Sequence, residues 1–145
     1  MKIIYFEDDP SALFKVDYIK EVLAHDVWHT QNFLELLYWL ECDPGAKHFH
    51  ALMFDLTVPV GNLPDFDQNE PYKHEKHHSP SIYFIEKYIS KEWSDFFESK
   101  KIIICSAFFQ AHRKNGVDFN RYYMLDKKSP TMIDDLKRIL DEIGE

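Results

Sequence analysis

The amino-acid sequence predicts an α/β fold, with a parallel sheet between two layers of helices. Short runs that are apolar at nearly every position alternate with longer segments of helical periodicity. Such runs indicate strands buried on both faces, as in a parallel sheet. Alternation of strand and helix is typical of a sheet covered on both sides. The 145 residues fit one domain spanning 1–145.

The first half of the chain is expected to form three strands and two helices. Lys2 to Phe6, Asp26 to Thr30 and Phe49 to Phe54 read as the strands. Ser11 to Ala24 and Phe33 to Leu40 have the apolar spacing of helices. The residues of the first helix expected to cluster toward one face are Leu13, Val16, Tyr18, Ile19, Val22 and Leu23.

The second half is expected to continue the alternation with helix, strand, helix, strand and helix. Pro130 suits the first turn of the last helix, because that position needs no backbone N–H donor. These elements are Ser81 to Phe97, Lys101 to Cys105, Ala107 to Lys114, Arg121 to Leu125 and Pro130 to Ile143.

Residues 56–80 break this rhythm, with prolines, a glycine and several acidic residues. We predict a surface loop insertion over residues 60–80. A loop this long in a compact domain usually either has a function or counts against the assignment of elements. The histidines His74, His77 and His78 lie within it. A solvated loop is favoured over a zinc site, because zinc usually binds spaced ligands on ordered elements.

Composition and charge restrict the environment and partners. The formal net charge of −8, without a basic run, disfavours binding to nucleic acid or an anionic membrane. Two cysteines, Cys42 and Cys105, do not make a disulfide framework and are expected in a reducing cytoplasm. No apolar stretch approaches the roughly 18 residues of a membrane span.

Polar residues follow the ends of four of the predicted strands. Ligands of open parallel sheets bind outside the carboxyl ends of the strands. If the first and third strands are neighbours, their carboxylates repel unless a cation lies between them. Magnesium satisfies this need, since it prefers oxygen ligands and often bridges carboxylate to phosphate. The residues concerned are Glu7, Asp8, Asp9, Asp55, Ser106 and Lys127.

The same set of residues suits phosphoryl transfer. A carboxylate can act as the nucleophile toward phosphorus, as in enzymes that form an aspartyl phosphate. A phosphoryl group on Asp55 would need donors, which the Ser106 hydroxyl and the Lys127 ammonium supply. Transfer of this group depends mainly on positioning and charge neutralisation.

Four motifs at these strand ends resemble those of the receiver domains of two-component response regulators. The resemblance covers nearly the whole chain apart from residues 60–80, and the motifs occur in the family's order. They are Phe6-Glu7-Asp8-Asp9-Pro10, Phe54-Asp55-Leu56-Thr57-Val58-Pro59, Ile104-Cys105-Ser106-Ala107 and Met124-Leu125-Asp126-Lys127.

The resemblance implies a flavodoxin-like (βα)5 fold with strand order 2-1-3-4-5 and phosphorylation at Asp55. It also implies Mg²⁺, or Mn²⁺, held by Asp8, Asp55 and the backbone carbonyl of Thr57, with Glu7 assisting through water. Ser106 would be the switch hydroxyl and Lys127 the phosphate-binding lysine. Any enzymatic activity would be limited to Mg²⁺-dependent self-phosphorylation and autodephosphorylation.

The register of the first motif and the switch position differ from the usual pattern. The acidic pair is either Glu7/Asp8 or Asp8/Asp9, and the position of Pro10 favours the first. Met124 occupies the position of the family's aromatic switch residue, with Tyr123 next to it. A coupled movement of tyrosine and serine is therefore in question.

The expected partners are a histidine kinase or phosphotransfer protein and a downstream protein target, without direct contact to nucleic acid or membrane. The alternative is a receiver-like (pseudo-receiver) protein-binding module that is never phosphorylated. A third reading is a phosphohydrolase of the haloacid dehalogenase type. That family has a second aspartate two residues after the nucleophile, where this chain has Thr57.

Overall fold

A parallel five-stranded sheet forms the centre of the molecule in the computed structural model. Its strand order is β2-β1-β3-β4-β5, as the resemblance implied. The strands are β1 (Lys2–Phe6), β2 (Asp26–Thr30), β3 (Ala51–Asp55), β4 (Ile102–Ser106) and β5 (Tyr123–Asp126). The structure describes residues 1–7, 9–10, 13–41, 49–56, 85–89, 91, 101–107, 109–110 and 119–145.

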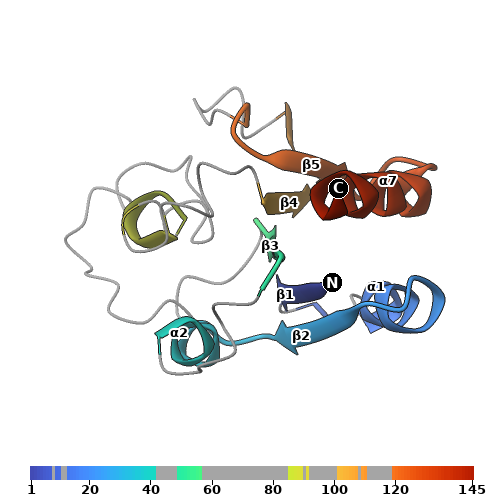
Figure 1. Cartoon of the computed structure of the whole chain (residues 1–145). Coiled ribbons are helices and arrows are strands. Elements are labelled where there is room, and N and C mark those ends of the chain that lie inside the picture. Colours follow the sequence, from blue (N-terminus) through green and yellow to red (C-terminus); the bar gives the residue numbers. More distant parts are fainter. Residues whose placement is uncertain are drawn as a thin grey trace.

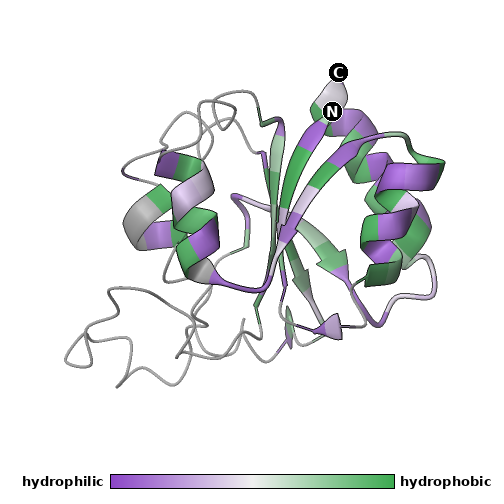
Figure 2. Cartoon of the chain, turned by 90° about the horizontal axis from the view of Figure 1, so that it is seen from below, coloured by the Kyte–Doolittle hydropathy of each residue, from purple (hydrophilic) through white to green (hydrophobic). Residues whose placement is uncertain are grey.

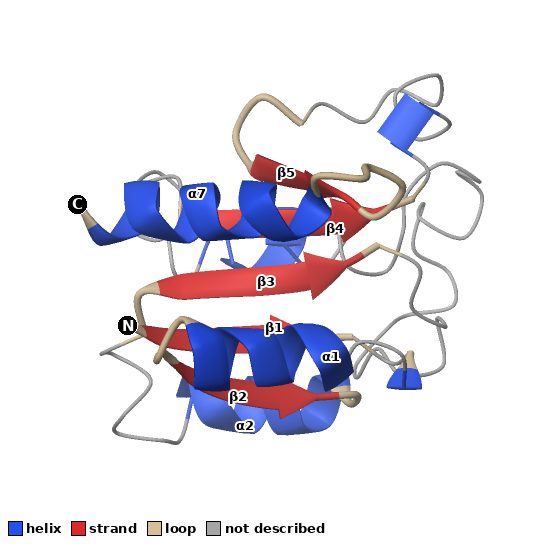
Figure 3. Cartoon of the chain, turned by 90° about the vertical axis from the view of Figure 1, so that its right-hand side faces the viewer, coloured by secondary structure: helices blue, strands red, loops and turns tan. Residues whose placement is uncertain are grey.

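All four strand pairs are parallel, so the carboxyl ends of the strands lie at one edge of the sheet (Figure 3). The predicted ends of three strands were one residue too early, because strand pairing continues into polar residues. Asp55 pairs with Cys105, and Ser106 pairs with Asp126. The polar residues expected just after these strands therefore belong to the sheet.

Helices cover both faces of the sheet (Figure 1). The α-helix α1 (Leu13–Asp17), the π-helix η2 (Tyr18–Val22) and α7 (Met132–Gly144) lie on one face. The α-helix α2 (Phe33–Glu41) and the π-helix η6 (Ile85–Ile89) lie on the other. No helix in the described ranges is long and apolar enough to cross a membrane.

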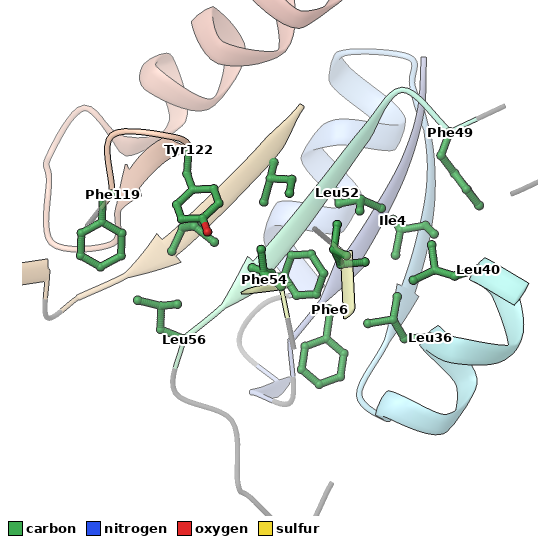
Figure 4. Packing of buried hydrophobic residues seen from close by; sticks show 14 of the residues in the cluster. Ile4, Phe6, Leu36, Leu40, Phe49, Leu52, Phe54, Leu56, Phe119 and Tyr122 are labelled. Atoms are coloured by element: carbon green, nitrogen blue, oxygen red, sulfur yellow. The ribbon is translucent and has the colours of Figure 1, made fainter. Parts of the chain in front are cut away.

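Each strand sends alternate side chains to two separate apolar clusters, as the period of two in a β-strand requires. Figure 2 shows apolar residues along the strands and a mixture of apolar and polar residues on the helices. Ile4 and Phe6 pack on the side of α2, where Figure 4 shows them with residues of the neighbouring elements. Ile3 and Tyr5 pack with residues of α1, η2 and α7.

The first helix differs from the sequence prediction in its winding and its end. Val16 and Ile19 are buried as expected, but Leu13 and Val22 are 52% and 65% exposed. From Tyr18 the helix has π geometry, so residues spaced for one face of an α-helix no longer share that face. Ala24 is outside the helix, with φ of 57°, so the prediction that the helix reaches Ala24 is wrong.

Several predictions lie wholly or partly outside the described residues. The loop insertion at residues 60–80 is among them, so this division of the domain stays a prediction. Of the predicted helices Ser81 to Phe97 and Ala107 to Lys114, the structure describes only residues 85–89, 91, 107 and 109–110.

Candidate functional site

The polar residues at the carboxyl edge are held by hydrogen bonds that continue the sheet beyond its strands. The Glu7 amide donates to the Thr30 carbonyl at 3.1 Å, and the Lys127 amide donates to the Ser106 carbonyl at 3.0 Å. His29 Nε2 donates to the Glu7 carbonyl at 3.0 Å. The backbone at Glu7 and Lys127 is therefore fixed by the sheet.

Strand alternation brings Glu7, Asp55 and Lys127 to the same face. Each follows by two residues a side chain of the cluster beneath α1 and α7: Glu7 follows Tyr5, and Lys127 follows Leu125. In β3, Asp55 follows Met53 in the same way. Because β1 and β3 are neighbours, the two carboxylates lie at adjacent strand ends.

Lys127 connects the two carboxylates. Its Nζ lies 2.6 Å from Glu7 Oε1 and 2.6 Å from Asp55 Oδ2. The two acids are almost completely buried, whereas the Lys127 side chain keeps 20% of its exposure. The structure thus brings together three of the predicted site residues across large sequence separations.

The close approach of the carboxylates affects their protonation. Burial and the hydrogen bond shared with Asp55 raise the pKa of Glu7, and the bonds from Lys127 and Tyr5 oppose this rise. Burial alone would lower the pKa of Lys127, but its hydrogen bonds to Asp55 and Glu7 raise it overall. Lys127 is therefore held in its charged form.

Two further residues contact Glu7, and the sequence analysis did not identify either of them. The Tyr5 hydroxyl donates a hydrogen bond to Glu7 Oε2. Lys15 Nζ, from α1, lies 3.3 Å from the same oxygen, and its side chain is 4% exposed. Tyr5 lies within an apolar run, so its hydroxyl was not singled out, and Lys15 lies in a helical segment, where a lysine is usually a surface residue. Alternation from Glu7 back to Tyr5 was the available signal.

Ser106 is fully buried at the end of β4 but belongs to the other row of side chains. Ile102 and Ile104, which share its side of the strand, pack in the cluster beneath α2. Met124 packs against this cluster, whereas Tyr123 packs with the opposite one and hydrogen bonds to Glu142. On this face Ser106 is in register with Asp126, and Met124 pairs with Ile104, two residues earlier along β4.

The predicted metal ligands Asp8 and Thr57 lie outside the described residues. Within the described ranges, no group of three or more acidic, histidine or cysteine side chains is arranged to hold a metal. Glu7 and Asp55 nevertheless supply adjacent carboxylates, which are the ligands that Mg²⁺ and Mn²⁺ prefer. The residues present therefore fit such an ion. Asp9 is exposed, as expected for the start of a loop.

Cys105 does not contribute a reactive group. It is fully buried in β4, and burial raises the pKa of its thiol to about 12. The thiol is therefore protonated at neutral pH, in agreement with its expected role as a packed side chain.

Comparison with known proteins identifies solved structures that share this fold. No family model matches the sequence, and no curated protein matches it significantly. Solved structures do match. The chemotaxis response regulator CheY4 of Vibrio cholerae has a TM-score of 0.55 at 15% identity, over 95% of this chain and 97% of that chain.

Two further structures extend this likeness. The receiver domain of a sensor histidine kinase from Pseudomonas aeruginosa, with a magnesium ion in its active-site cleft, has a TM-score of 0.54 at 14% identity, over 99% and 98% of the two chains. RcsB of Salmonella enterica, bound to promoter DNA with the phosphomimetic BeF₃⁻, has a TM-score of 0.58 at 18% identity, over 99% and 61%. The chain has the fold of response-regulator receiver domains.

Proposed function

We propose that this chain is a receiver domain that accepts a phosphoryl group on Asp55. The observation that carries the proposal is the ion-paired group Glu7–Lys127–Asp55 at the carboxyl edge of the sheet. Open parallel sheets bind ligands at this edge. The fold supports the same proposal, because the matching structures include receiver domains of signalling proteins.

The reaction follows from the chemistry of the carboxylate. An oxygen of Asp55 forms a bond to the phosphorus of a phosphohistidine, and the P–N bond breaks. The imidazole leaves with the electron pair and takes up a proton. Lys127, already 2.6 Å from Asp55, stabilises the negative charge on the phosphoryl oxygens. Hydrolysis of the product by water would restore Asp55 and release phosphate.

A divalent ion fits beside these residues. Mg²⁺ or Mn²⁺ would be held by Asp55 and Glu7 together with Asp8 and the carbonyl of Thr57, and would supply positive charge to the phosphoryl oxygens. Lys127 would then be shared between the carboxylates and the phosphoryl group.

The partners follow from this role. The phosphoryl donor would be a histidine kinase or a phosphotransfer protein, and phosphorylation would change binding to a downstream protein by shifting populations. We propose a cytoplasmic setting. The absence of direct nucleic-acid contact stays a prediction, because the matching RcsB structure contains promoter DNA.

Labelling with acetyl phosphate tests the proposal. Wild-type protein incubated with radiolabelled acetyl phosphate and Mg²⁺ should acquire label that hydroxylamine removes, as an acyl phosphate requires. Asp55→Asn should abolish the label. Asp26→Asn, an exposed aspartate at the start of β2, should retain it. Label that persists in Asp55→Asn, or a folded wild type without label, contradicts the proposal.

A second candidate is a pseudo-receiver that binds a partner without phosphorylation. It is favoured by the ion pairs themselves, since Lys127 and Lys15 already neutralise the two buried carboxylates. Among the described residues, no buried side-chain polar atom is left without a partner. A folded wild type that remains unlabelled with Mg²⁺ would select this candidate.

A further inference from the structure

The charge arrangement around Glu7 is asymmetric. Lys127 contacts Oε1 from β5, and Lys15 and Tyr5 contact Oε2 from α1 and β1. Both oxygens of the carboxylate therefore already accept hydrogen bonds. Lys15 is absent from the motifs that suggested a receiver domain.

Lys15 is positioned as a fixed charge. It is 3% exposed, although a lysine is rarely buried without a partner. Its ammonium lies 3.3 Å from Glu7 Oε2 and 5.7 Å from the centroid of the Tyr5 ring. Because the side chain is enclosed, water screens this charge only weakly.

The described acids and lysines of the site cancel in formal charge. Glu7 and Asp55 contribute two negative charges, and Lys15 and Lys127 contribute two positive ones. The Lys127 side chain keeps 20% of its exposure and can turn toward a phosphoryl group, whereas the Lys15 side chain keeps 4%. A divalent ion beside Glu7 would therefore be repelled by the Lys15 ammonium, which is buried and cannot move out into solvent.

We propose that the buried charge of Lys15 beside Glu7 lowers the affinity of the site for divalent cations. The inference rests on the metal-binding part of the proposed function. Removal of the Lys15 charge should tighten the binding of Mn²⁺. A purely structural role predicts the opposite sign, since loss of a support for Glu7 would disorder the site and weaken binding.

Mn²⁺ titration followed by electron paramagnetic resonance of the free ion tests this at pH 8. Lys15→Met should lower the Kd for Mn²⁺ by about tenfold, since a unit charge a few ångströms from a divalent ion interacts strongly even at an effective dielectric constant of about 20. Lys15→Gln removes the same charge but keeps an amide donor for Glu7, and should show the same direction. Lys20→Met removes an exposed charge from η2 and should leave the Kd unchanged.

The possible results separate the inference from the proposed function. If wild type binds Mn²⁺ and both Lys15 variants bind it with an equal or higher Kd, the inference is overturned and the proposed function is unaffected. Binding in none of the proteins overturns both the metal step and the inference. Binding that appears only in the Lys15 variants supports the inference and shows why wild type is inert.

A measurement on wild type covers the case in which the variants do not fold. Lysine side-chain NMR should show the Lys15 Nζ resonance shifting when Mg²⁺ is added, while Lys20 stays unchanged. A shift of Lys127 without a shift of Lys15 would overturn the inference.

Discussion

The two faces of the sheet end differently at its carboxyl edge. Beneath α1 and α7, the apolar rows end in charged residues, with Glu7 after Tyr5 and Asp55 after Met53. Beneath α2, the corresponding row of β4 ends in the hydroxyl of Ser106. The comparison shows that the ion-paired group of Glu7, Lys127 and Asp55 lies on the face where Lys15 of α1 can reach it.

The largest effect on stability is expected on the α2 side of the sheet, away from the ion pairs of Glu7, Lys127 and Asp55. Phe54→Ala should destabilise the protein by about 3–5 kcal/mol, because it leaves a cavity in a fully buried aromatic and aliphatic cluster. Urea unfolding would measure this. Since Phe54 points away from Glu7 and Lys127, the folded variant should still be labelled at Asp55. A loss below about 1 kcal/mol would contradict the packing described for this face.

On the charged face, removal of Lys127 is expected to be the most damaging change. Lys127→Met leaves two neighbouring buried carboxylates without their shared counter-ion and should cost about 2–3 kcal/mol. We place the value low because the lysine keeps 20% of its exposure. Urea unfolding in EDTA would measure it.

The matched control is Lys137→Met, which breaks an exposed ion pair with Asp141 on α7. Exposed pairs contribute little, so no measurable change is expected. Equal effects in the two variants would show that burial does not distinguish the pairs.

A smaller effect is expected from the hydroxyl of Tyr5. Tyr5→Phe removes a buried donor to Glu7 while keeping the ring, and should cost about 1–2 kcal/mol. Tyr38→Phe changes a tyrosine that is 61% exposed on α2 and should be neutral in the same unfolding assay. If Tyr5→Phe is neutral as well, the hydroxyl does not support Glu7.

The smallest effect is expected at the amino end of the sheet. The Met1 amine lies 3.0 Å from His25 Nδ1. The pKa of His25 is lowered from its ordinary value of 6.5, mainly because the side chain is desolvated and also because the amine is positively charged. The unfolded chain then binds more protons than the native protein just below pH 6.5, so stability is lost as pH falls from 6.5 through the lowered pKa.

His25→Gln removes this titration. As the pH falls through this window, wild type should therefore lose more unfolding free energy than His25→Gln does. A difference that is independent of pH would contradict the assignment to His25.

The fold could be predicted because the inner strands β1, β3 and β4 are apolar on both faces for most of their length. Apolar runs such as Ile102 to Cys105, when they alternate with helices, indicate the buried strands of a parallel sheet. The ends were less accurate, since Asp55 and Ser106 are polar yet remain in the ladder. The winding of η2 was not predictable, because π geometry has no distinct apolar period over one turn.

The site could be predicted only where a residue follows a strand end. Glu7, Asp55 and Lys127 meet because the carboxyl ends of parallel strands lie at one edge of the sheet, and these ends can be located in the sequence. Lys15 reaches Glu7 from a helix, and its burial depends on the tertiary packing of α1. That contact cannot be derived from spacing.

A crystal structure of the wild-type protein grown with Mg²⁺ and beryllium fluoride tests the central claim most directly. The account predicts beryllofluoride on an oxygen of Asp55, Lys127 Nζ turned from Glu7 to a fluorine, and a metal ion beside Glu7 and Asp55. An unmodified Asp55, with Lys127 still joining the two carboxylates and no metal beside them, would contradict it.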